Sequence, residues 1–248
     1  MPNGPAFDDA VRIAVATPGL GVGIHLSLVG EHCVAPPHHL GALVDSDGML
    51  PPSYPAFAKQ YLLRRFGQRE LRIEIEAQMQ RALATALPFT HLDSHQHLHM
   101  MPGVQDLVIT AALGAGIPVV RLPYESGGVN PHPYSFRGLQ LRGLSMLSRA
   151  RARILAEKGL RHADAFWGLA LSGMMTETSL LQTLEHLRPG VNEIMCHPGE
   201  SDATLCARYP WGYQWDAEEA ALLSEQVKDC IAARNIRLAN WRDAWATV

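Results

Sequence analysis

Apolar, β-branched segments alternate with segments of helical periodicity along most of this chain, and this order is the strongest constraint on its fold. Strands are predicted over Val22–Leu28, Phe89–Asp93, Ile117–Leu122, Ala163–Trp167, Asn192–Cys196 and Ile236–Ala239, and helices over Phe7–Ala16, Arg69–Leu87, Gly103–Ala115, Leu139–Lys158, Thr176–Arg188 and Asp216–Arg234. Strands separated by helices form parallel βαβ units. We therefore expect an α/β protein with a single barrel-like domain over residues 1–248, whose chemistry lies at the C-terminal ends of the strands.

Composition narrows the classes of protein that need to be considered. The chain has 248 residues, 47% hydrophobic and 18% charged, with a formal net charge of −3. This excludes intrinsic disorder and argues against nucleic-acid binding. No apolar run is long enough to span a membrane. The four cysteines lie far apart and form no CxxC pair, which indicates reduced thiols in a cytoplasmic protein.

The segment from His91 to His99 carries the strongest chemical signal, because four histidines and one aspartate fall within it. In an extended chain the side chains of His91, Asp93 and His95 point to one side. Convergent imidazoles and carboxylates are what a metal site requires. A polar loop that caps the following helix is the alternative, and the density of histidines favours metal binding or catalysis. His97 and His99 are further candidates, for substrate binding.

Three other positions have the right location for a site. His25 lies inside an apolar strand, His197 follows a strand that ends at Pro198-Gly199, and Arg121 follows four apolar residues. Each has a plainer interpretation. His25 could be a satisfied core histidine and His197 a turn residue. A buried arginine needs an acidic partner, so Arg121 could equally orient a catalytic carboxylate or form an ordinary ion pair.

An aromatic loop follows His197 and contains Trp211 and Tyr213. Stacking of a sugar on these rings and simple packing of the loop are equally compatible with the sequence. The chain has no GxSxG nucleophile elbow, no phosphate-binding GxxxxGK[ST] loop and no HExxH motif, which removes the mechanisms that depend on them.

Together these segments resemble the YdjC-like family of carbohydrate deacetylases, which includes chitooligosaccharide deacetylases. The Gly23–Leu26 strand, the run from His91 to His99 and Met195–Pro198 carry the resemblance, in the family's order and over nearly the whole chain. The segment Ala163–Ala170 further resembles the subgroup associated with hopanoid biosynthesis, which implies an N-acetylglucosaminyl hopanoid as the substrate.

The resemblance implies an irregular, TIM-like (β/α) barrel that binds one divalent metal ion, Mg²⁺ or Zn²⁺. It implies that His25 and His95 ligate this ion and that His197 assists as an acid. The reaction would be hydrolysis of the acetamide of an N-acetylated sugar or glycolipid. Arg121 could hold a carboxylate or stabilise the oxyanion, and Asp93 is the nearby carboxylate that could accept a proton from water.

The resemblance also predicts a gap. The family opens with a strand ending in Asn-Ala-Asp-Asp-Phe-Gly, whereas this chain begins with Met1-Pro2-Asn3-Gly4, which resembles the end of the family's second strand. We therefore expect the first βα unit and the metal's carboxylate ligand to be missing. Open strand edges would then invite association into a homo-oligomer. The alternative function is a non-catalytic relic of the family that retains a sugar-binding cleft.

Overall fold

The computed structural model describes residues 1–125, 127 and 136–245, without the side chains of residues 136 and 137. The chain divides into two compact units. The first contains Met1–Arg121, Arg153–His162 and Asn240–Val248, and the second contains Leu122–Ala152 and Ala163–Ala239. Helix α5 (Phe136–Glu157) has residues in both units. The single domain expected over residues 1–248 stays a prediction.

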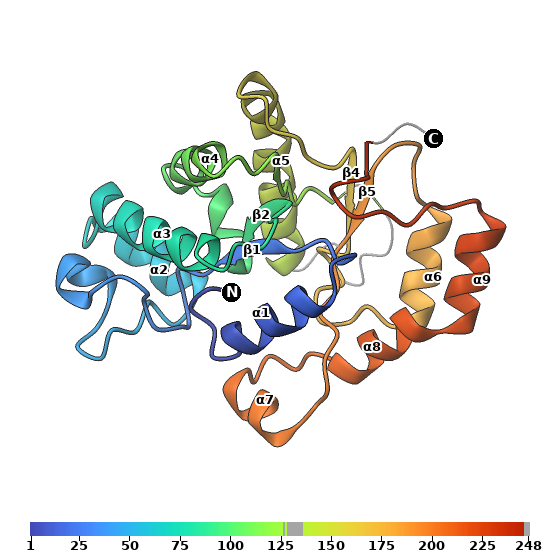
Figure 1. Ribbon diagram of the computed structural model, residues 1–248, viewed down its shortest axis with the longest axis horizontal. Coiled ribbons are helices and arrows are strands. Elements are labelled where there is room, and N and C mark those ends of the chain that lie inside the picture. The colour runs from blue at the N-terminus through green and yellow to red at the C-terminus, as the bar shows by residue number, and fades with distance from the viewer. Residues whose placement is uncertain (126, 128–135, 246–248) are drawn as a thin grey trace. The chain divides into compact units, whose positions relative to one another are not determined.

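The first unit is built on a parallel sheet with the strand order β1-β2-β3, made by β1 (Gly23–Leu26), β2 (His91–Ser94) and β3 (Val119–Val120). Its helices are α1 (Phe7–Ala16), α2 (Tyr54–Leu62), α3 (Gln68–Leu83) and α4 (Val104–Gly114), with short 3-10 helices η1 (Pro37–His39), η2 (Gly41–Leu43) and η3 (His95–Met100). Helices α3 and α4 pack against each other, as Figure 1 shows. The apolar side chains of Ile24, Leu26 and Leu92 are buried and form part of the core.

The register of this sheet sets the position of the polar side chains. Gly23 is opposite His91 and His25 is opposite Asp93. A Cβ atom on Gly23 would lie 2.3 Å from Nε2 of His91, so the absence of a side chain at Gly23 makes room for that imidazole. The register between β1 and β2 therefore places His25 directly opposite Asp93.

A buried polar network joins α3 to the segment that follows β1. The carboxylate of Glu74 accepts hydrogen bonds from the backbone N–H groups of Val34 and Ala35, at 3.0–3.1 Å. The side-chain amide of Gln78 donates to Glu74 at 2.8 Å and to the carbonyl of Ser27 at 2.6 Å. Because buried polar groups need such partners, this network fixes Ser27, which directly follows β1 and lies two residues beyond His25.

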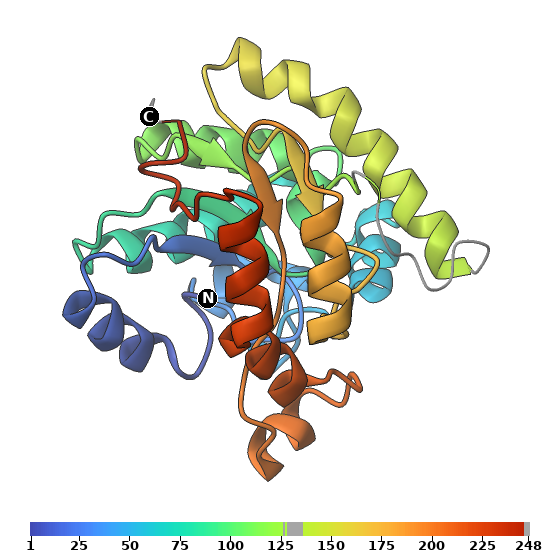
Figure 2. The same ribbon diagram turned by 90° about the vertical axis from the view of Figure 1, so that its right-hand side faces the viewer.

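The second unit contains a parallel pair of strands, β4 (Ala165–Trp167) and β5 (Asn192–Ile194). Its remaining helices are α6 (Glu177–Glu185), α7 (Ala203–Arg208), α8 (Trp215–Leu223) and α9 (Glu225–Ala233). Figure 2 shows α6 and α9 side by side. A core cluster of Leu171, Met175, Leu180, Leu184, Ala221 and Val227 joins these helices.

The mixed α/β class with parallel strands is confirmed, and several element predictions need correction. The residues predicted as one helix over Asp216–Arg234 form α8 and α9, because the chain is extended at Ser224 (ψ 131°) and the Ser224 hydroxyl caps α9. The strand predicted over Ile236–Ala239 is not formed, and Leu238 there is exposed. The strands in the described part of the chain belong to two separate sheets and form no closed barrel, so the TIM-like barrel stays a prediction.

Two simpler observations complete the fold. Within the described ranges, no helix combines the length and apolar character needed to cross a bilayer. Cys33, Cys196, Cys206 and Cys230 are all free thiols, as their spacing in the sequence predicts.

Candidate active site

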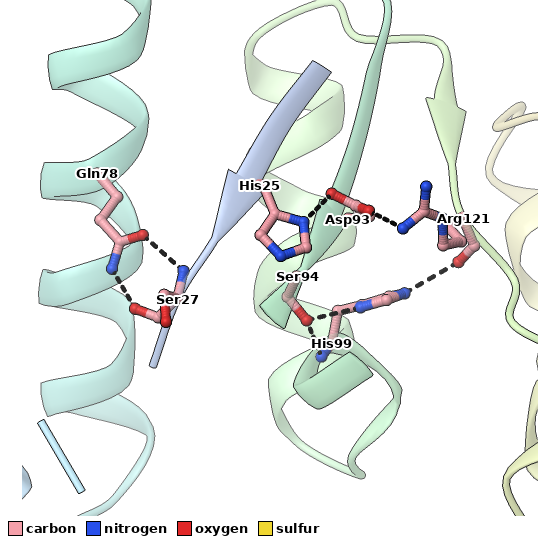
Figure 3. Close-up of polar contacts among 7 residues, drawn as sticks. All are labelled: His25, Ser27, Gln78, Asp93, Ser94, His99 and Arg121. Carbon is pink, nitrogen blue, oxygen red and sulfur yellow. Dashed lines mark hydrogen bonds and ion pairs between the residues drawn. The ribbon is translucent and has the colours of Figure 1, made fainter. Parts of the chain in front are cut away.

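His25, Asp93 and Arg121 form a row across the sheet of the first unit. The backbone N–H of Arg121 donates to the carbonyl of Leu92 at 3.1 Å, so the residue directly after β3 continues the register of β2. His25 Nδ1 lies 2.7 Å from Oδ1 of Asp93, and the Arg121 guanidinium forms an ion pair with Oδ2 of the same carboxylate. Figure 3 shows the carboxylate between the imidazole and the guanidinium. The acidic partner that Arg121 requires is therefore Asp93.

The electrostatics of this row keep Asp93 ionised. Burial alone would raise the pKa of Asp93, but the charges of His25 and Arg121 and the hydrogen bond from His25 hold it well below its ordinary value. The carboxylate side chain is 6% exposed and the Arg121 side chain 15%. Both carboxylate oxygens have partners, so Asp93 is placed to hold His25 and Arg121. Its predicted role as a proton acceptor stays a prediction.

His25 and His95 lie close enough to act on one ligand. Their ring centroids are 5.9 Å apart, with an interplanar angle of 68°. The proton on His25 Nδ1 points at Asp93, which leaves Nε2 for a metal ion, and the side chain is 33% exposed. These two imidazoles would supply two of the three protein ligands that a catalytic zinc ion has. The described residues contain no group of three or more potential ligands.

His99 is a structural element of the site. The residue is fully buried. Its Nε2 lies 3.0 Å from the carbonyl oxygen of Arg121, which can only accept, so Nε2 carries the proton. Nδ1 then accepts from the Ser94 hydroxyl at 2.7 Å, and Ser94 Oγ accepts from the His99 backbone at 2.8 Å. Both ring nitrogens are used within the protein, which ties η3 to the end of β3. The predicted contact of His99 with substrate stays a prediction.

This burial predicts a measurable pH dependence of stability. Burial lowers the pKa of His99 from 6.5 to about 4, so the folded state resists its protonation. The stabilisation is complete above pH 6.5 and is lost as the pH falls to about 4, because the unfolded chain binds the proton first. As the pH falls from 6.5 to about 4, the free energy of unfolding of His99→Gln should decrease by about 3 kcal/mol less than that of the parent protein. Urea titrations across this pH range test it. Equal losses in His99→Gln and in the parent would contradict this prediction. The control His39→Gln, which removes an exposed histidine and keeps His99, should lose as much stability as the parent, and a reduced loss like that of His99→Gln would also contradict it.

His97 lies in a backbone turn that sequence patterns do not predict. Gln96 and His97 have φ angles of 52° and 54°, in the left-handed region, which residues other than glycine rarely adopt. The turn lies directly after His95, and the side-chain oxygen of Gln96 accepts a hydrogen bond from the backbone of Tyr54 at 2.8 Å. Burial lowers the pKa of His97 well below its ordinary value, so His97 contributes a neutral imidazole beside His99.

In the second unit His197 follows β5 and contacts the predicted aromatic loop. Its ring centroid is 5.2 Å from that of Tyr213, and Tyr213 is 5.3 Å from Trp211. Tyr213 and Trp211 also pack against Trp215, which is buried, whereas Trp211 is 42% exposed. Both interpretations of the loop therefore remain open. Tyr213 and Trp215 agree with packing of the loop, and the exposed ring of Trp211 agrees with stacking of a sugar. β5 ends at Ile194 and not at Cys196, so His197 lies three residues after the strand, and its role as an acid stays a prediction.

Two buried polar residues that hold candidate histidines, one in each unit, give no distinct sequence signal. Ser94 is buried at the end of β2 and holds His99. Glu218 is buried on α8 and its carboxylate accepts a hydrogen bond from the backbone of His197. An acidic residue in the first turn of a helix is favoured by the helix dipole whether or not it makes another contact, so only the burial of Glu218 in the folded chain reveals this one.

Comparison with known proteins gives consistent results over nearly the whole chain. Residues 1–233 match a protein family described as YdjC-like protein. A chitooligosaccharide deacetylase of Yersinia pestis (strain Pestoides F) is 32% identical over 255 residues, covering 98% of this chain and 85% of the relative. A carbohydrate deacetylase of Thermoanaerobacter pseudethanolicus is 26% identical over 241 residues, covering 97% and 84%. A crystal structure from Enterococcus faecalis V583, titled as a cellobiose-phosphate cleavage protein, matches with a TM-score of 0.73 and 23% identity, covering 98% of this chain and 85% of that one. This last similarity concerns the fold.

Proposed function

The chain belongs to the YdjC-like protein family, and on that premise we propose that it is a metal-dependent carbohydrate deacetylase. The substrate would carry an N-acetylamino sugar, and the reaction would hydrolyse its acetamide. The names of the relatives, carbohydrate deacetylase and chitooligosaccharide deacetylase, support the reaction class. A chitooligosaccharide is the first substrate to test, and an N-acetylglucosaminyl hopanoid is the second.

The observation that carries this proposal is the pairing of His25 with His95, with Asp93 behind His25. A histidine that ligates a metal usually donates its other ring N–H to a carboxylate, which fixes its orientation. His25 makes this contact with Asp93 at 2.7 Å, and the His95 ring lies 5.9 Å away, between centroids. Two imidazoles with open positions suit Zn²⁺ or another transition metal ion.

The roles of the individual residues follow from this arrangement. A bound divalent ion would polarise the acetamide carbonyl and lower the pKa of a coordinated water. His25 and His95 would hold that ion. Asp93 orients His25 and is the nearby carboxylate that would accept the proton of the water, although its low pKa makes it a weak base. Arg121 holds the Asp93 carboxylate in place, and its positive charge favours an oxyanion nearby.

The remaining groups that we propose for the reaction, His197 and the aromatic loop, belong to the second unit. His197 would donate a proton to the departing amine, a step that general acids accelerate. This role requires the His197 imidazole to reach the acetamide nitrogen. Trp211 would stack against a pyranose ring, with Tyr213 and Trp215 supporting it. Stacking on an exposed tryptophan combines a large apolar contact with a polar edge, which suits sugars.

Release of acetate from N-acetylglucosamine oligomers, measured in metal-free protein and after titration with Zn²⁺ or Mg²⁺, tests the proposed function. Turnover that appears with metal and saturates with ion concentration is the expected result. Saturable sugar binding without turnover in the presence of either ion would instead favour the non-catalytic relic. Turnover that persists at full rate in metal-free protein would contradict the assignment of His25 and His95.

A further inference from the structure

Glu218 is a buried carboxylate without a role in the proposed reaction, and it contacts the residue proposed as the proton donor. It lies on α8 and is 1% exposed. Oε2 accepts a hydrogen bond from the backbone N–H of His197, and Oε1 accepts one from Met175 at 3.1 Å. One side chain therefore fixes both the segment after β5, which carries His197, and the segment after β4, which carries Met175.

The ring of His197 is restrained by a second contact, from Tyr213. Tyr213 lies directly over Gly173 (φ +79°), where a Cβ atom would come within 2.2 Å of the tyrosine ring. Its hydroxyl is 3.0 Å from that of Ser172, and the neighbouring Gln214 donates from its backbone to Gly173 at 2.8 Å. The tyrosine is thus held in place, and its ring contacts the imidazole in a T-shaped arrangement with centroids 5.2 Å apart.

We propose that Glu218 is a positioning residue for His197, which keeps the imidazole in one orientation for proton donation. The inference rests on the proposed function only in naming His197 as the donor. A carboxylate is required because two backbone N–H groups converge on it and each needs an acceptor. A glutamine would offer one oxygen and turn its own N–H₂ group toward the other donor.

The variant Glu218→Gln tests this inference, with Glu219→Gln as the matched control on the same helix. Displacing a reacting group by roughly 1 Å can lower a rate about 100-fold. We expect Glu218→Gln to lower kcat by about this factor with little change in KM, and to shift the NMR signals of the His197 ring, which His197→Gln identifies by their loss. Glu219→Gln should change neither quantity, since its side chain is partly exposed.

Either readout alone can overturn the inference. Unchanged His197 ring signals in Glu218→Gln would show that the carboxylate does not position the imidazole, whatever happens to the rate. An unchanged kcat would show that positioning does not matter to the reaction. If Glu218→Gln does not fold, Glu218→Asp, which shortens the side chain by one methylene, takes its place with the same two outcomes. If the parent protein does not turn over, the proposed function fails while the NMR signals still decide the role of Glu218.

Discussion

His95→Ala should reduce metal-dependent deacetylation by more than about 100-fold while the chain remains folded. Even the outer partners of metal ligands change affinity or activity by 10–100-fold, and His95 is proposed as a ligand itself. The residue is partly exposed and lies at the start of η3. A substitution at such a position usually changes stability by less than about 1 kcal/mol. The loss should therefore come from the site and not from unfolding.

The measurements for His95→Ala are acetate release, metal affinity by calorimetry and urea unfolding, all in the same buffer. The control is His39→Ala, which removes an exposed histidine in η1. We expect the control to match the parent protein in all three measurements. Metal affinity and activity like the parent's in His95→Ala would contradict the two-histidine site. Loss of activity without loss of metal affinity would move His95 from metal binding to another role.

The sequence predicts part of the arrangement of His25, Asp93 and Arg121. Each residue lies in or directly after an apolar, β-branched segment, so parallel strands bring all three to one edge of a sheet. Alternation along β2 also predicts that His91 and Asp93 share a face, and the register places Gly23 and His25 opposite them. The sequence leaves the partner of Arg121 open, because an arginine that orients a site and one in an ordinary ion pair have the same local pattern.

Other features depend on contacts that no local pattern contains. The left-handed turn at Gln96 and His97 aims the residues after His95, although nothing in these residue types favours it. The inward position of Glu218 depends on N–H groups supplied by Met175 and His197, which are distant in sequence. The break between α8 and α9 is a single residue, Ser224. The helical periodicity of the sequence continues across this residue, so the sequence predicts one helix. Long-range hydrogen bonds thus decide what periodicity leaves undetermined.

Asp93→Asn should lower both the stability of the protein and its affinity for the metal ion. An asparagine keeps the shape, but it removes the charge that balances Arg121 and directs an N–H₂ group toward either the guanidinium or the His25 ring. Breaking a buried ion pair by removing one partner costs about 3–5 kcal/mol, because the other charge is left uncompensated. Loss of the carboxylate behind His25 should also weaken metal affinity by about 10–100-fold. Urea unfolding of metal-free protein and calorimetric titration measure these two effects separately.

Glu74→Gln is the control that separates the two effects of Asp93→Asn. Glu74 is also a fully buried carboxylate, but its partners are the backbone of Val34 and Ala35 and the side chain of Gln78. It should lower stability without a comparable loss of metal affinity. An equal loss of affinity in both variants would mean that the metal site responds to general destabilisation, and Asp93 would have no specific role.

A double variant with Arg121→Gln should recover part of the stability that Asp93→Asn loses, because the unpaired buried charge is then removed. Since recovery of stability does not restore the carboxylate behind His25, metal affinity in the double variant should remain low, which distinguishes the ion pair from the orientation of the ligand.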